Sequence, residues 1–392
     1  MASTSALSPL SALVRNAFLL RFATAVVLHV FFSETLFAPD QETYHYFSAW
    51  LSRYWAGETL IYPGRLLAAE PRGYYYIVAS LYYVFGEFAL LPKLLNAGVG
   101  ALTVRLVHDI AIRITGNDAM ALRTAKYVCY FPSLVLWSAL NIRDCWVVLC
   151  IVLISREVLL LQERFRPLAL LRVVAAIFLM TQFRDYLLFA VTLPMILAFV
   201  VRNQRHLLRN AVVGMILATV VISADQAAGM NRKLRTPDFE QLNSMRRWSS
   251  TAAGSGFAQD ADISTPGKAL AFLPVGLAYF LLAPFPWTIA NVRQGITLPE
   301  MLFFYSLLPP MFTGIRTLLR ERLGQSLMVL LITAGLTFGY AIGQGNVGTI
   351  YRHRSQVLSF YLMFAAVGVE VRRARRSPAP LPQGIQAARV VS

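Results

Sequence analysis

Charged residues are scarce in this chain of 392 residues: only 14% are Asp, Glu, Lys or Arg, with 20 acidic residues against 36 basic ones. Cysteine is rarer still. Cys129, Cys145 and Cys150 lack Cys-x-x-Cys spacing, which gives no indication of a zinc ribbon or a disulfide framework. The glycine patterns of a P-loop or a Rossmann turn and the nucleophile elbow of hydrolases are also absent. The soluble enzyme classes that those motifs define are therefore not indicated.

Apolar residues are abundant instead, at 57% of the chain with a mean hydropathy of +0.55. Both values lie outside the usual range of soluble proteins. At about 20 apolar residues per crossing helix, the length predicts an all-α, polytopic transmembrane bundle of roughly ten spans. We expect one integrated membrane domain over residues 1–371 and a disordered, cytoplasmic, Pro/Arg-rich tail over residues 372–392. Residues 1–18 lack a signal-peptide cleavage site, so the first span is expected to be uncleaved.

The formal net charge of +16 comes from basic residues at the ends of apolar runs, not from one patch, so no nucleic-acid partner is expected. Positive charge marks the cytoplasmic side. With Arg15 and Arg21 in the cytoplasm, the first span (19–37) runs outward and delivers Asp40 to the outer face. The other elements expected under this rule are a tyrosine-rich interfacial or re-entrant helix (73–83), crossings at 91–114 and 127–140, and an incomplete crossing at 269–287.

The junction after the first span is the most informative place for chemistry. Asp40 and Glu42 stand at the mouth of a membrane helix, where carboxylates are costly and where the pKa of a general base is readily tuned. They would point the same way on an extended segment but diverge by about half a turn on a helix. The plainer alternative is that Asp40 caps a helix after Pro39.

Tyr44 and His45 follow directly and are predicted to bind substrate. Four side chains of this face could together bind a divalent cation through oxygen and imidazole: Asp40, Glu42, His45 and Asp144. Their spacing is not that of a metal motif, so no metal ligand is assigned.

Two Arg-Asp dipeptides fall at the outer ends of later spans. Arg143-Asp144 follows the apolar run that ends at Ile142, and Arg184-Asp185 repeats the dipeptide further along. Each pair could simply seal a helix end, or the two could anchor one another. The alternative is that they contribute to one shared site on the outer face.

A glycine-rich segment, 343–354, ends in Arg352-His353-Arg354 at the start of the last span. Glycines let backbone N–H groups approach an anion, and arginines supply charge and planar donor pairs that suit phosphate. The alternative is a flexible turn whose arginines reach lipid headgroups. We favour anion binding, because positive charge is normally depleted on the outer side.

This order of features resembles the GT-C superfamily of membrane glycosyltransferases, which use polyprenyl-phosphate sugars and include protein mannosyltransferases and aminoarabinose transferases. The features are an acidic motif just outside a first span, a tyrosine-rich helix ending at Phe85-Gly86, the segment Leu-Pro-Lys-Leu-Leu-Asn from Leu91, and a second acid at Asp144. The resemblance covers about residues 15–200. The C-terminal helices, about 201–371, match no motif of that family.

The resemblance implies that an acid of the first external loop acts as the base and that a second acid lies in the next external loop. These positions correspond to Asp40 or Glu42, and to Asp144. Because this chain has Asp-Gln-Glu where the family has adjacent acids, the choice between Asp40 and Glu42 stays open. The expected partners are a polyprenyl-phosphate sugar, a glycan or protein acceptor and the lipid bilayer.

The sequence therefore predicts an inverting glycosyltransferase of the cell envelope, in a bacterial inner membrane with its site facing the periplasm. Arg352 and Arg354 are expected to hold the departing phosphate. Two alternatives stay open. A surface-polysaccharide polymerase or ligase acting on lipid pyrophosphates would also use external arginines, and a transporter or flippase would place ionisable residues at mid-membrane depth.

Overall fold

The computed structural model describes residues 8–64, 72–184, 186–202, 239–252, 254–289 and 292–376. Over these residues the protein is helical and contains no strand. The N-terminal half comprises α1 (Pro9–Phe31), α2 (Asp40–Trp55), α4 (Gly73–Phe85), α5 (Leu90–Thr115), α6 (Asp118–Tyr130), α7 (Pro132–Ala139), α8 (Asp144–Glu163), α9 (Pro167–Phe183) and α10 (Leu187–Arg202). The C-terminal half comprises α12 (Phe239–Thr251), α13 (Pro266–Leu282), α14 (Val292–Glu321), α15 (Leu323–Gly343) and α16 (Val347–Arg376).

Local sequence signals set several helix ends. Ser8 caps α1 through its side chain, with Pro9 in the first turn, and Asn117 accepts a hydrogen bond from the backbone N–H of Met120 at the start of α6. Between α5 and α6 the chain reverses at Gly116, whose φ of +65° is readily adopted only without a Cβ. At Pro132 the missing N–H and the fixed φ separate α6 from α7.

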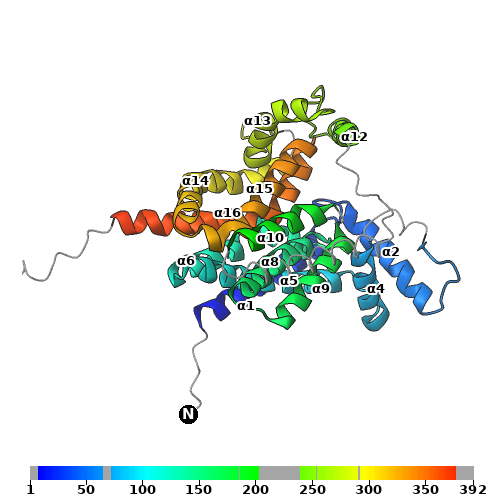
Figure 1. Cartoon of the computed structure of the whole chain (residues 1–392). Helices are drawn as coiled ribbons and strands as arrows, with labels where there is room; N and C mark the ends of the chain where they lie inside the picture. The colour runs from blue at the N-terminus through cyan, green and yellow to red at the C-terminus, as the bar shows by residue number, and fades with distance from the viewer. Residues whose placement is uncertain are drawn as a thin grey trace, which may run out of the picture.

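Figure 1 shows the first helix and the long α16 reaching the same side of the molecule as α6, while α2 and α4 lie on the opposite side. Contacts agree with this view, because Arg123 of α6 forms an ion pair with Glu370 near the end of α16. At the opposite end, Lys93 at the start of α5 contacts Glu34, just after α1. We call the side with the start of α1 the terminal end, and the other the loop end.

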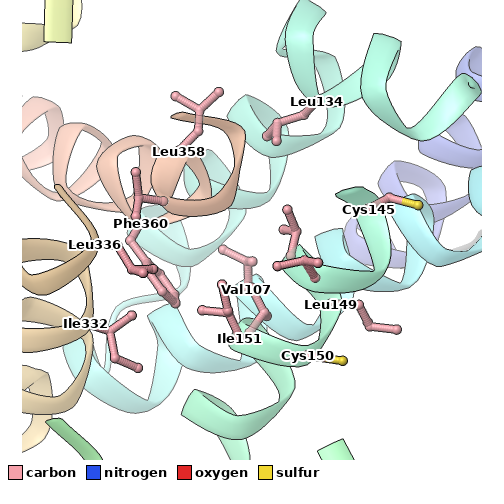
Figure 2. Packing of buried hydrophobic residues seen from close by; sticks show 14 of the residues in the cluster. Val107, Leu134, Cys145, Leu149, Cys150, Ile151, Ile332, Leu336, Leu358 and Phe360 are labelled. Carbon is pink, nitrogen blue, oxygen red and sulfur yellow. The ribbon is translucent and has the colours of Figure 1, made fainter. Parts of the chain in front are cut away.

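The core is shared by the two halves of the chain. Figure 2 shows Val107 of α5 and Ile151 of α8 close to Leu336 of α15 and Phe360 of α16, all of them fully or almost fully buried. Between α14 and α16 the backbones approach closely, since a Cβ on Gly314 would meet the carbonyl of Phe364. Buried Cys129, Cys145 and Cys150 are free thiols that belong to this packing.

Four helices are long and apolar enough to cross a membrane: Pro9–Phe31, Leu90–Thr115, Gln294–Glu321 and Leu323–Gly343. They support a membrane protein, and the predicted crossing at 91–114 coincides with α5. The described helices do not establish ten spans. The tyrosine-rich α4 has 13 residues, and α13, predicted as an incomplete crossing, has 17, so both are shorter than a bilayer core requires.

Other boundaries differ from the sequence prediction. The first span begins earlier than residue 19 and ends at Phe31, before the polar segment Ser33-Glu34-Thr35. The predicted crossing at 127–140 is divided at Phe131. Helix α16 continues to Arg376, so the tail predicted from residue 372 begins as helix, and residues 377–392 lie outside the described part.

The largest difference from the sequence prediction concerns Arg21, which was expected in the cytoplasm but is buried in the middle of α1. Its guanidinium donates to the carbonyls of Cys129 and Val128 at 3.0 and 3.1 Å and to the hydroxyl of Ser138 at 2.9 Å. Pro132 cannot donate the helical hydrogen bond to the Val128 carbonyl, since it has no N–H. Arg21 therefore satisfies a backbone acceptor that the helix break exposes.

Candidate functional site

Four charged side chains from separate parts of the chain meet at the loop end. Arg352 of α16 donates to one oxygen of Asp144 through Nε and Nη2, at 2.9 and 2.6 Å, and to Asp40 through Nη1 at 2.7 Å. Arg184 donates from Nη2 to the other oxygen of Asp144 at 2.9 Å. We call Asp40, Asp144, Arg184 and Arg352 the charged cluster.

Helix starts and ends position this cluster. Asp144 is the first residue of α8, Arg184 directly follows α9, and Asp40 is the first residue of α2, after Pro39. Asp40 is thus not the cap residue, although the N-terminal end of a helix favours a carboxylate there. Arg352 lies in the second turn of α16 and spans the space between the two acids.

Exposure falls steeply across the cluster. The Asp40 side chain is 49% exposed, that of Arg352 17%, that of Arg184 7% and that of Asp144 0%. Burial lowers the pKa of Arg184, but Asp144, Tyr186 and Tyr340 together outweigh this effect and raise the pKa above its ordinary value. Arg184 therefore stays charged, and Asp144 acts as a buried anchor with arginines on both of its oxygens. Asp40 is the member most accessible to a substrate.

A neutral histidine extends the cluster inward. Arg184 Nη1 lies 2.8 Å from His353 Nε2 and donates to the Tyr186 hydroxyl at 2.6 Å. Since arginine has no acceptor, Nε2 of His353 must accept, which leaves the proton on Nδ1 and the ring uncharged. Tyr340 packs on this ring at 4.8 Å between centroids and donates to Gln356 at 2.5 Å.

A hydrogen-bonded scaffold connects the two acids. Gln41, beside Asp40, accepts from the backbone N–H of Asn141 at 2.8 Å, within the turn that precedes Asp144. Asn96 donates to the carbonyls of Leu140 and Ile142 in that turn, at 2.7 and 2.9 Å. The turn and the first turn of α2 are thereby fixed to α5, which holds Asp40 and Asp144 around the same arginine.

The scaffold residues were not found by sequence reasoning. Gln41 and Asn96 are ordinary polar residues, and only their burial in an apolar chain could have indicated a structural role. Lys93 is also buried, with Nζ 2.6 Å from Glu34 Oε1. Burial raises the pKa of Glu34, but hydrogen bonds from Lys93 and His29 outweigh it and lower the pKa below its ordinary value.

Two predicted residues of α2 lie near the cluster without a contact to it that the structure records. Glu42 is exposed, turned about half a helical turn from Asp40. His45 Nδ1 pairs with the Tyr82 hydroxyl at 2.8 Å, and Nε2 lies 3.5 Å from Glu87, so this ring serves the contact between α2 and α4.

Tyr44 and Arg143 lie closer to the cluster. Tyr44 is buried against Tyr74 and Tyr75, and burial raises the pKa of its phenol, which therefore stays protonated. Arg143 is near enough to act electrostatically on both Tyr44 and His353. Asp185, the other half of the second Arg-Asp dipeptide, lies outside the described residues.

Arg354 is not brought to the charged cluster. It is buried and donates through Nε to the carbonyl of Phe280 at 2.8 Å, and through Nη2 to that of Ala283, so it caps the end of α13. Two helical residues after Arg352, it points to a different side of α16. The prediction that both arginines hold one phosphate treated residues 352–354 as a loop.

The glycine-rich segment, 343–354, is also engaged in contacts with other parts of the chain. Its nonhelical part is only Gln344-Gly345-Asn346, where the Gly345 carbonyl accepts from the Phe257 N–H at 3.0 Å and the Val347 N–H donates to Ser255 at 3.0 Å. These glycines serve close backbone pairing with the segment before α13.

The charged cluster does not form a metal site. Within the described residues, no group of three or more His, Cys, Asp and Glu side chains is arranged to hold an ion. Both Asp144 oxygens receive arginine donors, and Glu42 and His45 face elsewhere. The donor set present is instead suited to an anionic or hydroxyl-bearing ligand.

No protein-family model and no curated protein matches this chain. The resemblance of residues 15–200 to GT-C enzymes remains a prediction from the order of sequence features.

Proposed function

We propose that this protein is an integral membrane glycosyltransferase that moves a sugar from a polyprenyl-phosphate donor to a hydroxyl of a lipid-linked glycan, polysaccharide or protein. The observation that carries the proposal is the half-exposed Asp40, held at 2.7 Å by an arginine that is itself fixed by the buried Asp144. This is a carboxylate of defined orientation at the edge of an apolar bundle, as a general base requires.

In the proposed reaction, Asp40 accepts the proton of the acceptor hydroxyl as its oxygen attacks the anomeric carbon. The bond between that carbon and the phosphate oxygen breaks, and the phosphate leaves with the electron pair. A single displacement inverts the anomeric configuration. Arg352 positions Asp40, and Asp144 positions Arg352.

The arginines of the cluster support an anionic donor. Arg184 and Arg352 bring guanidinium N–H donors to the half-exposed Asp40 and the buried Asp144. Charge-assisted contacts are strong in a water-poor site and would stabilise the departing phosphate. Arg354 is not assigned to phosphate binding, because its guanidinium already donates to backbone carbonyls at the end of α13.

We further propose that the loop end faces the periplasm and that roughly ten crossings complete the bundle. The described helices support this by reversing direction between the two ends, and the arginines of 372–376 lie at the terminal end. A bacterial inner membrane is the setting that fits such a donor.

The test is Asp40→Asn, with Glu42→Gln as the matched control. We expect Asp40→Asn to lower transfer by a factor of about 10² to 10⁴, because the amide cannot accept the proton. Glu42→Gln should remain near wild type, since Glu42 has no recorded contact with the cluster. The measurement is product formation in membranes supplied with a lipid-phosphate sugar, at equal membrane abundance.

Near-normal transfer by Asp40→Asn would remove Asp40 as the base. Polymerisation of lipid-pyrophosphate-linked units by the same variant would then favour the polymerase or ligase alternative.

A further inference from the structure

A hollow lies at the terminal end, far from the charged cluster. It encloses about 570 Å³ between the start of α1, the middle of α6 and the end of α16. Its wall is mixed, with apolar Ala12, Leu13 and Leu122 beside Arg123, Lys126 and Arg373. The volume is within the range of sites for small molecules and lipid headgroups.

Most charged side chains of the hollow are basic. Its lining contains Arg123, Lys126 and Arg373 but only one acidic residue, Glu370. Arg123 is paired with Glu370, so it fixes α6 to α16. Lys126 and Arg373 are exposed and stand on two different helices. An anion between them would link α6 and α16 a second time.

The apolar side of the hollow continues onto a lipid-facing helix. Helix α1 is a candidate span with only 17% of its apolar window buried. Leu20 and Val27 follow the lining residue Leu13 at seven-residue spacing, so they lie on the same face of α1, and both are exposed. At the inner margin, Asn16 donates to the Tyr130 hydroxyl at 3.3 Å. Basic residues at the level of the helix ends, above an apolar track, match the two parts of a phospholipid.

We propose that this hollow binds an anionic phospholipid, with its phosphate between Lys126 and Arg373 and an acyl chain along α1. The site is independent of the proposed catalysis. On α16, Arg352 and Arg373 are 21 residues apart, which corresponds to roughly 30 Å, so a lipid here cannot be the donor bound at the cluster. Its role is to join α1, α6 and α16.

The experiment uses the full chain in detergent, with phosphatidylglycerol, phosphatidylcholine or inorganic phosphate as the probe. Native mass spectrometry measures retained lipid, and thermal denaturation measures stabilisation. The test variant is Lys126→Gln with Arg373→Gln. The control is Arg375→Gln with Arg376→Gln, which removes the same amount of charge from the end of α16, outside the hollow.

We expect the wild type and the control to retain phosphatidylglycerol in preference to phosphatidylcholine. The test variant should bind phosphatidylglycerol roughly 30-fold more weakly, which corresponds to about 1 kcal/mol for each basic residue. Its melting temperature without added lipid should equal that of the control, which shows that it is folded.

Three results would overturn the proposal. The first is unchanged phosphatidylglycerol affinity in the test variant, and the second is an equal loss in the control, which would indicate unspecific attraction to basic helix ends. The third is stabilisation by inorganic phosphate as strong as that by phosphatidylglycerol, which would make the hollow a site for a free anion.

Discussion

At the scale of single residues, the two aspartates that bind Arg352 have different roles. Asp144 has no exposed side-chain surface and holds Arg184 and Arg352 on its two oxygens, whereas half of Asp40 faces outward. Removing one partner of a buried ion pair leaves a charge without compensation, while an exposed pair contributes little to stability. Asp144 thus stabilises the fold, and Asp40 remains accessible for chemistry.

We therefore expect Asp144→Asn to lower the free energy of unfolding by roughly 3–5 kcal/mol. Asp40→Asn makes the same chemical change at the exposed partner and should leave stability almost unaltered. Heating the purified variants in detergent and measuring the remaining monodisperse protein would compare them. Equal melting temperatures for the two variants would contradict the assignment of Asp144 as a structural anchor.

The sequence predicted which residue types would gather at this site better than it predicted their partners. Asp40, Asp144, Arg184 and Arg352 were each identified from their place at the end of an apolar run, and the structure brings them into contact. Arg354 was grouped with Arg352 because residues 343–354 were treated as a loop. Once α16 begins at Val347, helical geometry turns the two arginines to different sides.

At the scale of helices, the contact between α1 and α5 depends on a residue without a side chain. A Cβ on Gly100 would lie 2.6 Å from Arg21 Nε and 2.8 Å from the Ser138 Cβ, whereas a Cβ on Gly98, half a turn earlier in α5, would meet nothing within 4 Å. Gly100 thus makes room for the guanidinium that satisfies the carbonyls at the α6–α7 break.

Gly100→Ala should consequently destabilise the protein by about 1–3 kcal/mol, the usual cost of overpacking a well-filled core. Gly98→Ala should be neutral or slightly stabilising, since alanine favours a helix over glycine. Thermal denaturation of both variants in detergent is the measurement. A similar loss of stability in both variants would show that the space around Arg21 does not distinguish the two positions, and would contradict this assignment of Gly100.

This buried arginine also shows why element boundaries were less predictable than element types. Arg21 was expected to mark the cytoplasmic start of a span, because positive charge usually does so. Its actual partners, Val128 and Cys129, are more than a hundred positions away. No local pattern reveals that a proline in another helix has left a carbonyl for it. Ionisable residues do lie inside candidate spans, since Arg21 and Glu300 are both buried there.

At the scale of the whole molecule, the sequence could predict both the helical class and the position of the first and last helix ends on one side. Hydropathy predicted a helical membrane protein, and the spacing of arginines predicted that both ends share one side. The structure places the start of α1 and the end of α16 around the same hollow. The number of crossings is not established in this way, because helices such as α8 and α16 carry polar residues that serve partners inside the bundle.

We expect fusions after Arg376 and at the N-terminus to report the cytoplasmic side of the membrane. A periplasm-active reporter should be inactive at both positions and active when inserted within residues 57–61, in the exposed turn after α2. The physical reason is the excess of arginine at the end of α16. Activity of the reporter after Arg376 would invert the orientation and place the charged cluster on the cytoplasmic side.

The charged cluster also has a consequence for synthesis. Arg352 follows Asp144 by 208 positions, whereas Arg184 follows it by 40. At about 5–20 residues per second, a ribosome would complete Arg352 roughly 10 to 40 s after Asp144. During that interval the contact between Asp144 and Arg352 is missing, and the N-terminal helices are in the membrane with an incomplete site. The contacts of Asp144 are therefore complete only when α16 is inserted, and we expect a chain truncated before α16 to be degraded faster than the full chain.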